Sequence, residues 1–408
     1  MHKMTSSLRE RTLEQTLLLA EEFAGRVGIT RVTNVTWLDK IGIPVFSSIR
    51  PGAARGSLCV NAGKGRFPDE AKVGAYMEAI EFHYAEFRNR ASDTVELTVA
   101  EMMSQSACKF SFLDLNPILG LEIRGDDRVT CVHAQDLASG EKVPIPAELV
   151  YHPFLENAHK RIFGTSTNGL CSGNTMDEAT LHGLAELMER DVQAFDEFKD
   201  RSSLVDLSSG SEVLCYLQSR IVEAGFSLAL RHTPNVYGLP YFQAFILEEV
   251  VDSPVAICYG SAFHPCREIA AVRAITEAAQ SRLTQIHGGR DDVTDRATYF
   301  SKHGGRPEER NATSAARKIV TDSSRRTTYL EVEDAGPKIS NIRDGLDLLI
   351  GALHANGMKQ ILRCRLTPID SSLTVVKIIV PGLEYFRPEL KRVGPRLMQY
   401  IKATRATA

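Results

Sequence analysis

The sequence contains no run of about 18 apolar residues, the length that a membrane-spanning helix needs. Its polar amino terminus, Met1 to Arg11, lacks the apolar stretch of a secretory signal, so we expect a cytoplasmic protein. Basic residues are not in excess either, because 48 Lys and Arg stand against 51 Asp and Glu, a net charge of −3. Without a basic field, neither nucleic acid nor a membrane surface is expected as a partner.

Familiar cysteine and nucleotide motifs are also missing. The eight cysteines are spread over the chain and form no Cys-x-x-Cys pair, so neither a disulfide framework nor a thiolate zinc site is indicated and buried, reduced thiols are favoured. Neither the Walker A pattern nor the G-x-G-x-x-G fingerprint occurs. Any nucleotide site must therefore be of another kind.

What is present is an ordinary globular composition over 408 residues, with 43% hydrophobic and 24% charged residues. No Pro/Gly/Ser-rich linker divides the chain, so we expect one large mixed α/β domain over 1–408. Within it we distinguish an amino-terminal part (about 1–92), a connecting region without clear periodicity (about 93–162), a carboxy-terminal part (about 163–395) and a short tail to 408.

Hydrophobic periodicity predicts alternating helices and strands. A first helix begins near Leu13 and ends near Gly25 or Gly28, and further helices are expected over 69–87, 176–198, 212–224, 267–285 and 346–355. Strands are expected over 31–36, 43–49, 226–231, 241–249, 254–259, 360–366 and 373–380. The polar, arginine-rich stretch 287–326 is interpreted as a long exposed loop or lid.

One segment of the chain repeats at an offset of 108 residues. The match pairs Gly65, Glu70, Ala71, Glu78 and Glu81 with Gly173, Glu178, Ala179, Glu186 and Glu189. Each copy is a strand, a glycine-containing turn and a helix with a Glu-x-x-Glu pair. A looser third copy follows Gly260-Ser261 and carries Arg273, Glu277 and Gln280.

The repeated carboxylates point to a divalent cation. Residues i and i+3 share one helix face, so each pair holds two like charges together among apolar neighbours. Hard oxygen donors of this kind suit Mg²⁺, which retains water and substrate phosphates as further ligands. The turns Gly63-Lys64-Gly65 and Ser172-Gly173-Asn174 precede helix amino termini, which favour anions. Arg273 shares a helix face with Glu277 and Gln280 and offers a guanidinium for a γ-phosphate.

Other interpretations of the same residues stay open. A single Glu-x-x-Glu occurs by chance on many solvated helices, and only the two copies in register favour a site. Cys171 directly precedes the second turn, but without an identifiable histidine partner we expect no nucleophilic role for it.

Six longer motifs are spread over nearly the whole chain. They are Gly28-Ile-Thr-Arg31, Leu38-Asp39-Lys-Ile-Gly-Ile-Pro44, Ser172-Gly-Asn-Thr-Met-Asp-Glu178-Ala179, Glu186-Leu-Met-Glu189-Arg190-Asp191, Arg273-Ala-Ile-Thr-Glu277-Ala-Ala-Gln280-Ser-Arg282 and Pro381-Gly-Leu-Glu384. Together these motifs resemble those of the YcaO family. The resemblance implies a non-P-loop ATP-binding fold that activates a peptide backbone amide. A nucleophile adds to the carbonyl, and ATP phosphorylates the resulting oxyanion.

The resemblance also implies roles for individual residues. The expected magnesium ligands are Glu78, Glu81, Glu186 and Glu189. Arg273 and Glu277 are expected to be catalytic and to contact ATP, together with Lys64, Ser172, Asn174, Glu178, Arg190, Gln280 and Arg282. Arg9 and Thr16 fall on a basic and a hydroxyl position, seven apart, that the family uses from its first helix. The implied cofactors are ATP and Mg²⁺, and the family precedent favours a homodimer.

The carboxyl end separates subtypes of the family. Azoline-forming members usually end in a Pro-x-Pro-x-Pro tail, whereas this chain reads Gly394-Pro395-Arg396 and has no later proline. We therefore expect thioamide formation on a peptide with a TfuA-like partner, in modified-peptide biosynthesis. The alternatives are an azoline-forming cyclodehydratase, an accessory factor in ribosomal-protein methylthiolation, an ATP-dependent carboxylate-amine ligase, and a non-enzymatic ATP-binding accessory.

Overall fold

A computed structural model describes the chain except for residues 5, 156–158, 251–252, 254, 291–294, 407 and 408. The chain forms two compact units, each built from segments that are distant in sequence. The first unit comprises Met1–Ala53, Leu58–Ala79 and Arg201–Ser340, and the second comprises Ala54–Ser57, Ile80–Asp200 and Asn341–Ala408. Residues 93–162, expected as a connection, lie wholly within the second unit.

The first unit contains a five-stranded sheet in the order β13-β12-β11-β10-β14 and a three-stranded sheet in the order β3-β4-β5. All strand pairs in these sheets are antiparallel except β10 with β14. The strands are β1 (His2–Lys3), β2 (Leu8–Arg9), β3 (Arg31–Asn34), β4 (Val45–Ile49), β5 (Val60–Lys64), β10 (Ser203–Asp206), β11 (Ser227–His232), β12 (Tyr241–Leu247), β13 (Ile257–Phe263) and β14 (Arg326–Thr328). The helices are α1 (Leu13–Arg26), α2 (Pro68–Ala85, which continues into the second unit after Ala79), α5 (Glu212–Glu223), α6 (Arg267–His287), α7 (Asp295–Lys302) and α8 (Gly305–Val320).

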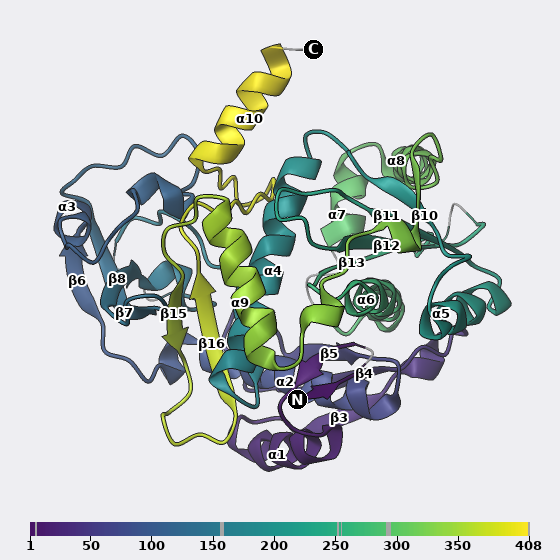
Figure 1. The fold of residues 1–408 in the computed structure, drawn as a ribbon, viewed down its shortest axis with the longest axis horizontal. Helices are drawn as coiled ribbons and strands as arrows, with labels where there is room; N and C mark the ends of the chain where they lie inside the picture. Colours follow the sequence, from purple (N-terminus) through teal and green to yellow (C-terminus); the bar gives the residue numbers. More distant parts are fainter. Residues whose placement is uncertain (5, 156–158, 251–252, 254, 291–294, 407–408) are drawn as a thin grey trace. The chain divides into compact units, whose positions relative to one another are not determined.

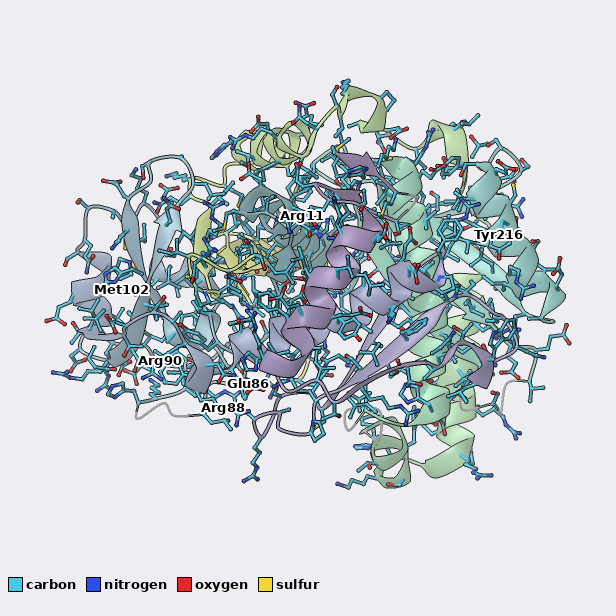
Figure 2. All side chains as sticks on the ribbon, turned by 90° about the horizontal axis from the view of Figure 1, so that it is seen from below. Arg11, Glu86, Arg88, Arg90, Met102 and Tyr216 are labelled. Atoms are coloured by element: carbon cyan, nitrogen blue, oxygen red, sulfur yellow. The ribbon has the colours of Figure 1, made fainter. Side chains whose placement is uncertain are left out.

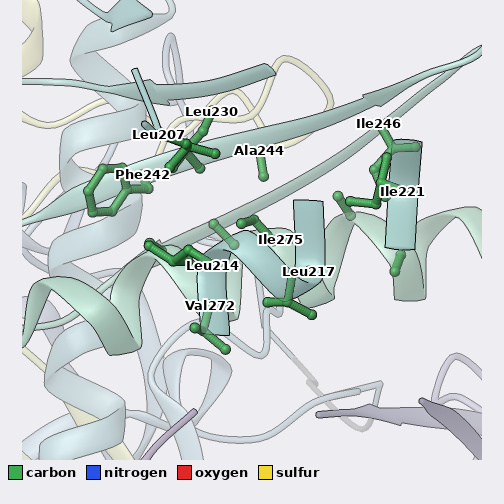
Figure 3. Packing of buried hydrophobic residues seen from close by; sticks show 14 of the residues in the cluster. Leu207, Leu214, Leu217, Ile221, Leu230, Phe242, Ala244, Ile246, Val272 and Ile275 are labelled. Carbon is green, nitrogen blue, oxygen red and sulfur yellow. The ribbon is translucent and has the colours of Figure 1, made fainter. Parts of the chain in front are cut away.

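The core of the first unit lies between the five-stranded sheet and helices α5 and α6 (Figure 3). Helix α6 packs along β12 and β13 (Figure 1). The apolar residues follow the expected periods, every second residue on β12 and i, i+3, i+7 on α5. They are Phe242, Ala244 and Ile246 from β12 and Leu214, Leu217 and Ile221 from α5. Burying each large aliphatic side chain contributes about 1.5–3 kcal/mol, which is why this face holds the unit together.

The second unit is built on a sheet in the order β6-β7-β15-β16-β9, with β8 paired to β7. Helix α4 packs on β9 and β16, and α9 lies beside it (Figure 1). The strands are β6 (Val95–Thr98), β7 (Arg128–Asp136), β8 (Lys142–Pro146), β9 (Leu170–Gly173), β15 (Leu362–Arg365) and β16 (Thr374–Ile379). The helices, besides the end of α2, are α3 (Val99–Met103), α4 (Met176–Asp196), α9 (Ile342–Ala355) and α10 (Pro395–Ala406).

A buried carboxylate ties the short segment Ala54–Ser57 into this second unit. Glu86 directly follows α2 and is fully buried. It accepts a hydrogen bond from the backbone N–H of Ala54 at 3.0 Å and forms an ion pair with Arg88 at 2.6 Å. Glu86 and Arg88 are labelled in Figure 2.

Residues 93–162, where the sequence shows no clear period, contain the antiparallel strands β6, β7 and β8. The expectation of a long loop further along the chain is wrong. The stretch 287–326, expected as a loop, holds α7 and α8, and its residues 291–294 lie outside the described part. Alanine, arginine, lysine and glutamate are strong helix formers, and a solvated helix needs few apolar residues, so polarity alone was a poor sign of a loop.

The cysteine expectation holds in part. All eight are free; Cys131, Cys258, Cys266 and Cys364 are buried, whereas Cys215 is exposed. Among the described residues, no helix is both long and apolar enough to cross a membrane.

Candidate functional site

The sequence repeat corresponds to a repeated strand-turn-helix structure. Strand β5 leads into α2, and β9 leads into α4. The first residues of these two helices, Pro68 and Met176, are 108 positions apart. A methyl group on Gly65 would lie 2.4 Å from Cβ of Glu70, and one on Gly173 would lie 2.7 Å from the backbone N of Ala179. Both turns therefore require glycine because each packs directly on the first turn of its helix.

Equivalent polar contacts hold the two turns. Glu70 accepts a hydrogen bond from the backbone N–H of Arg66 at 2.8 Å. In the second copy, Glu178 is fully buried and accepts from the side-chain amide of Asn174 at 3.2 Å. Asn174 and Glu178, two predicted nucleotide contacts, thus lie together at the start of α4.

The looser third copy shares a different glycine contact. A methyl group on Gly260 would lie 2.3 Å from the carbonyl oxygen of Ala274, and one on Gly63 would lie 2.0 Å from that of Ala71. Strand β13 therefore approaches α6 as closely as β5 approaches α2.

In the first unit, four predicted residues gather around the free edge of β5. That edge leaves the N–H and C=O of Ala62 without a partner strand, and side chains take its place. The Ala62 N–H donates to Glu78 at 2.6 Å, and its carbonyl accepts from Gln280 at 3.0 Å. Two residues further along β5, Lys64 forms an ion pair with Glu277. The structure thus brings Lys64 of β5, Glu78 of α2 and two residues of α6, Glu277 and Gln280, together at the edge of one strand.

Burial changes the acidity of Glu78. Desolvation raises its pKa, while the nearby charges of Arg290 and Lys64 and the bond from Ala62 act in the opposite direction. The Glu277 carboxylate adds a further upward contribution to this pKa. A cation at Glu78 would relieve this cost of holding the charge, which suits a metal ligand.

The second unit holds the other three predicted metal ligands. Glu81 accepts two hydrogen bonds from Ser172, one from the backbone N–H of Ser172 at 2.8 Å and one from its hydroxyl at 2.5 Å. On α4, desolvation raises the pKa of Glu186; Arg190 opposes the rise, and the Glu189 charge one helical turn away adds to it. Glu189 itself is buried and lies 3.2 Å from Arg190.

These donors fit a hard divalent cation, since they are carboxylate oxygens held at half-buried helix faces. Glu78 belongs to the first unit, and Glu81, Glu186 and Glu189 belong to the second. Among the residues that the structure describes, no cluster of three or more His, Cys, Asp or Glu side chains is arranged as a metal site. The ligand assignment therefore stays a prediction.

Three more predicted residues of the first unit lie in different settings. Thr16 is buried in α1, where its hydroxyl donates to the carbonyl of Thr12 at 3.0 Å. Arg9 is not on the first helix as expected: it lies in β2, because a capping box of Thr12 and Gln15 starts α1 only at Leu13. Arg273 is half-buried on α6 and faces the same side as Glu277 and Gln280.

Arg282 has a strong structural environment. It is buried, with ion pairs to Asp39 at 2.9 Å and Glu248 at 3.1 Å and a hydrogen bond to the carbonyl of Val255. The guanidinium also lies 4.2 Å from the ring centroid of Phe226. These contacts account for its burial without a nucleotide, and its role toward ATP stays a prediction.

Sequence reasoning did not flag a buried lysine beside the predicted ligand Glu186. Lys377 lies in β16 and donates to the carbonyl of Ser166 at 2.6 Å. Desolvation lowers its pKa to about 7 although the charge of Glu186 favours the protonated form. A charged residue inside the apolar run Val375-Val376-Lys377-Ile378-Ile379 was the available signal. Cys171, set aside as a nucleophile, also contacts Glu186, with its sulfur 3.7 Å from a carboxylate oxygen.

The sequence that carries these residues matches a protein family. A sequence model described as "YcaO cyclodehydratase, ATP- and Mg²⁺-binding" matches residues 62–384, and the chain belongs to the YcaO family. Two relatives match nearly the whole chain and are both described as uncharacterized. One, from Methanothermobacter thermautotrophicus, is 33% identical over 378 residues, 92% of this chain and 94% of its own length. The other, in the tfuA 3′ region of Rhizobium leguminosarum bv. trifolii, is 33% identical over 369 residues, 88% of this chain and 84% of its own.

Solved structures share the fold. The YcaO protein from Methanopyrus kandleri, bound with AMPPCP and Mg²⁺, has a TM-score of 0.71 and 21% identity and covers 95% of this chain and 96% of its own. A heterocyclase in complex with substrate and cofactor has a TM-score of 0.75 and 21% identity over 97% of this chain and 56% of its own. These matches confirm the mixed α/β fold class. ATP and Mg²⁺, the cofactors expected from the resemblance, are confirmed as those of the family.

Proposed function

We propose that this protein uses ATP and Mg²⁺ to activate a peptide backbone amide by O-phosphorylation, and that the product is a thioamide formed with a TfuA-like partner. Family membership carries the ATP-dependent part of the proposal. The relative encoded in a tfuA 3′ region supports the partner. The Escherichia coli microcin synthetase complex with pro-MccB17, which shares the fold at a TM-score of 0.62 and 15% identity over 86% of this chain and 87% of its own, supports a peptide substrate.

Each predicted residue has a task in this reaction. Glu78, Glu81, Glu186 and Glu189 would hold Mg²⁺, and bound Mg²⁺-ATP would supply the phosphoryl group. Lys64 would orient Glu277 through their ion pair. Arg273 would stabilise charge on the transferred group, a contribution that reaches about 10³-fold in rate for positioned arginines.

A further group of predicted residues would order the turn at the start of α4. Glu178 holds the amide of Asn174 in place, and Ser172 and Arg190 flank the carboxylates of the second unit. The other proposed nucleotide contacts are Arg9, Thr16, Gln280 and Arg282. A homodimer is the proposed assembly.

An azoline-forming cyclodehydratase is the second candidate, since the family model itself carries that description. The two chemistries differ in the source of the nucleophile. Thioamide formation needs an external sulfide equivalent, whereas azoline closure uses a Cys, Ser or Thr of the peptide.

Mass spectrometry of the peptide separates the candidates. The protein, ATP and Mg²⁺ are incubated with a candidate peptide, with and without sulfide and the TfuA-like partner. We expect a mass change equal to an oxygen-to-sulfur exchange that requires sulfide and ATP. Loss of one water without sulfide would overturn the thioamide assignment in favour of azoline formation, and ATP-dependent joining of an amine to a carboxylate would favour a ligase.

A further inference from the structure

His264 carries a buried hydrogen-bond donor that lacks an acceptor. It follows β13, directly before α6, and only 3% of the residue is exposed. Its Nδ1 accepts a hydrogen bond from the backbone N–H of Cys266 at 3.0 Å. Because that nitrogen accepts, the proton of the neutral ring is on Nε2. The buried Nε2 has no hydrogen-bond partner within the described part of the chain.

The surroundings of this donor are positive. Burial is the main cause that lowers the pKa of His264 to about 3; the charges of Arg273 and Lys3 contribute in the same direction, and the hydrogen bond from Cys266 acts against them. The ring is therefore neutral at physiological pH. The tautomer stays fixed, with Nε2–H as a permanent donor.

Arg273 is a second donor without an acceptor. Among the described residues its guanidinium makes no hydrogen bond or ion pair, although the residue is half-buried. The acidic residue one turn further along the same face, Glu277, is bound to Lys64. Buried donors in native proteins are nearly always satisfied, so an unpaired N–H near an unpaired guanidinium indicates a missing anion.

We propose that the Nε2–H of His264 donates a hydrogen bond to a phosphate oxygen held beside Arg273, as a binding residue for the phosphoryl group. The proposal rests on the proposed function for its ligand, the terminal phosphate of ATP. The shared chemistry is a phosphate oxyanion, so the anion is either part of the nucleotide or the inorganic phosphate that the reaction releases. His264 thereby joins the site from the loop between β13 and α6.

An isosteric pair of variants tests the hydrogen bond. His264→Met and His264→Gln have nearly the same shape, but only glutamine places an N–H near the Nε2 position. Calorimetry with AMPPCP, ADP and adenosine is expected to show that the methionine variant loses about tenfold or more in AMPPCP affinity, because a hydrogen bond to a charged group is lost. ADP affinity falls less, adenosine affinity is unchanged, and the glutamine variant retains most of the AMPPCP affinity.

His232→Met is the matched control, because His232 is another buried histidine of the first unit, at the end of β11. Thermal unfolding of all variants checks their folding. Equal AMPPCP affinity in wild type and a folded His264→Met variant overturns the proposal. In ¹⁵N-histidine-labelled wild type, AMPPCP is expected to shift an Nε2–H resonance of a neutral histidine, and the absence of any shifted Nε2–H resonance contradicts the proposal even where variants fail to fold.

A titration with inorganic phosphate separates this proposal from the proposed function. If wild type binds no AMPPCP but binds phosphate through His264, the ATP-dependent function fails and the anion site stands. If it binds neither, both fail.

Discussion

At the scale of single residues, the predicted metal ligands also serve the fold. Glu78 satisfies the free edge of β5 with one carboxylate oxygen while its charge is disfavoured by burial. Structural and functional roles in such a residue are separable, because the hydrogen bond needs only an acceptor, whereas the cation needs the charge.

Glu78→Gln is therefore expected to weaken Mg²⁺-ATP binding strongly while changing stability by less than about 1 kcal/mol, since the glutamine oxygen still accepts from Ala62. Calorimetry and chemical denaturation measure the two effects. The control is Glu70→Gln, which preserves an acceptor for Arg66 and removes no predicted ligand. Unchanged Mg²⁺-ATP affinity in the Glu78 variant would remove Glu78 from the metal site.

Two arginines of α6 are expected to respond in opposite ways. Arg282→Ala leaves the buried Asp39 without its partner and should destabilise the protein by about 3–5 kcal/mol. Arg273→Ala should leave stability nearly unchanged but slow phosphoryl transfer by about 10³-fold, with ADP binding nearly normal. Denaturation midpoints and single-turnover rates test both, and near-normal turnover of the Arg273 variant would refute its assigned role.

Buried histidines make stability depend on pH. The pKa of His152 is lowered to about 4 and that of His264 to about 3, chiefly by burial. As the pH falls, these histidines take up protons in the unfolded chain before they do so in the folded protein. The free energy of unfolding is therefore at its full value above about pH 6.5 and decreases as the pH drops toward the pKa values of the folded protein, by up to about 1.4 kcal/mol per pH unit for each histidine. Urea denaturation at about pH 7 and pH 5 should show a smaller loss in His152→Gln than in wild type. The control is His133→Gln, because His133 is exposed. An equal loss of stability in wild type and in His152→Gln would contradict the assignment of the pH dependence to His152.

At the scale of elements, the strand-turn-helix copies were the most predictable part. The predicted helices at α2, α4 and α6 end within about two residues of their observed ends, because capping, glycine turns and a long apolar stripe are all local signals. What the pattern could not supply was the partner of each side chain. The bonds of Glu78 and Gln280 to Ala62 join residues far apart in sequence, and no local period encodes them.

The close strand-helix approach gives a prediction at this scale. Gly260→Ala should cost about 1–3 kcal/mol, since its methyl group would lie 2.3 Å from backbone atoms of α6. Gly25→Ala in α1 meets no atom within 4 Å and should be neutral or stabilising by up to about 1 kcal/mol. Thermal denaturation compares the two, and an unaffected Gly260 variant would show that α6 is free to move away from β13.

At the scale of the whole molecule, the family was predictable from ordered motifs, whereas the division into two units was not. Segments 58–79 and 201–340 join one unit, and 80–200 and 341–408 join the other, so the domain boundaries follow tertiary contacts rather than composition. The same limit applies to the site, because its predicted residues come from both units. Thioamide chemistry, the partner and the homodimer remain proposals.

The central claim is that ATP phosphorylates the oxygen of a peptide amide, and one isotope measurement tests it most directly. A substrate peptide with ¹⁸O in its backbone carbonyls is converted in unlabelled water with ATP and Mg²⁺, and the released phosphate is examined by mass spectrometry. The account predicts one ¹⁸O in the phosphate for each modified amide, because the carbonyl oxygen leaves on phosphorus. Modified peptide accompanied only by unlabelled phosphate would contradict it, since the ATP would then have been hydrolysed by water.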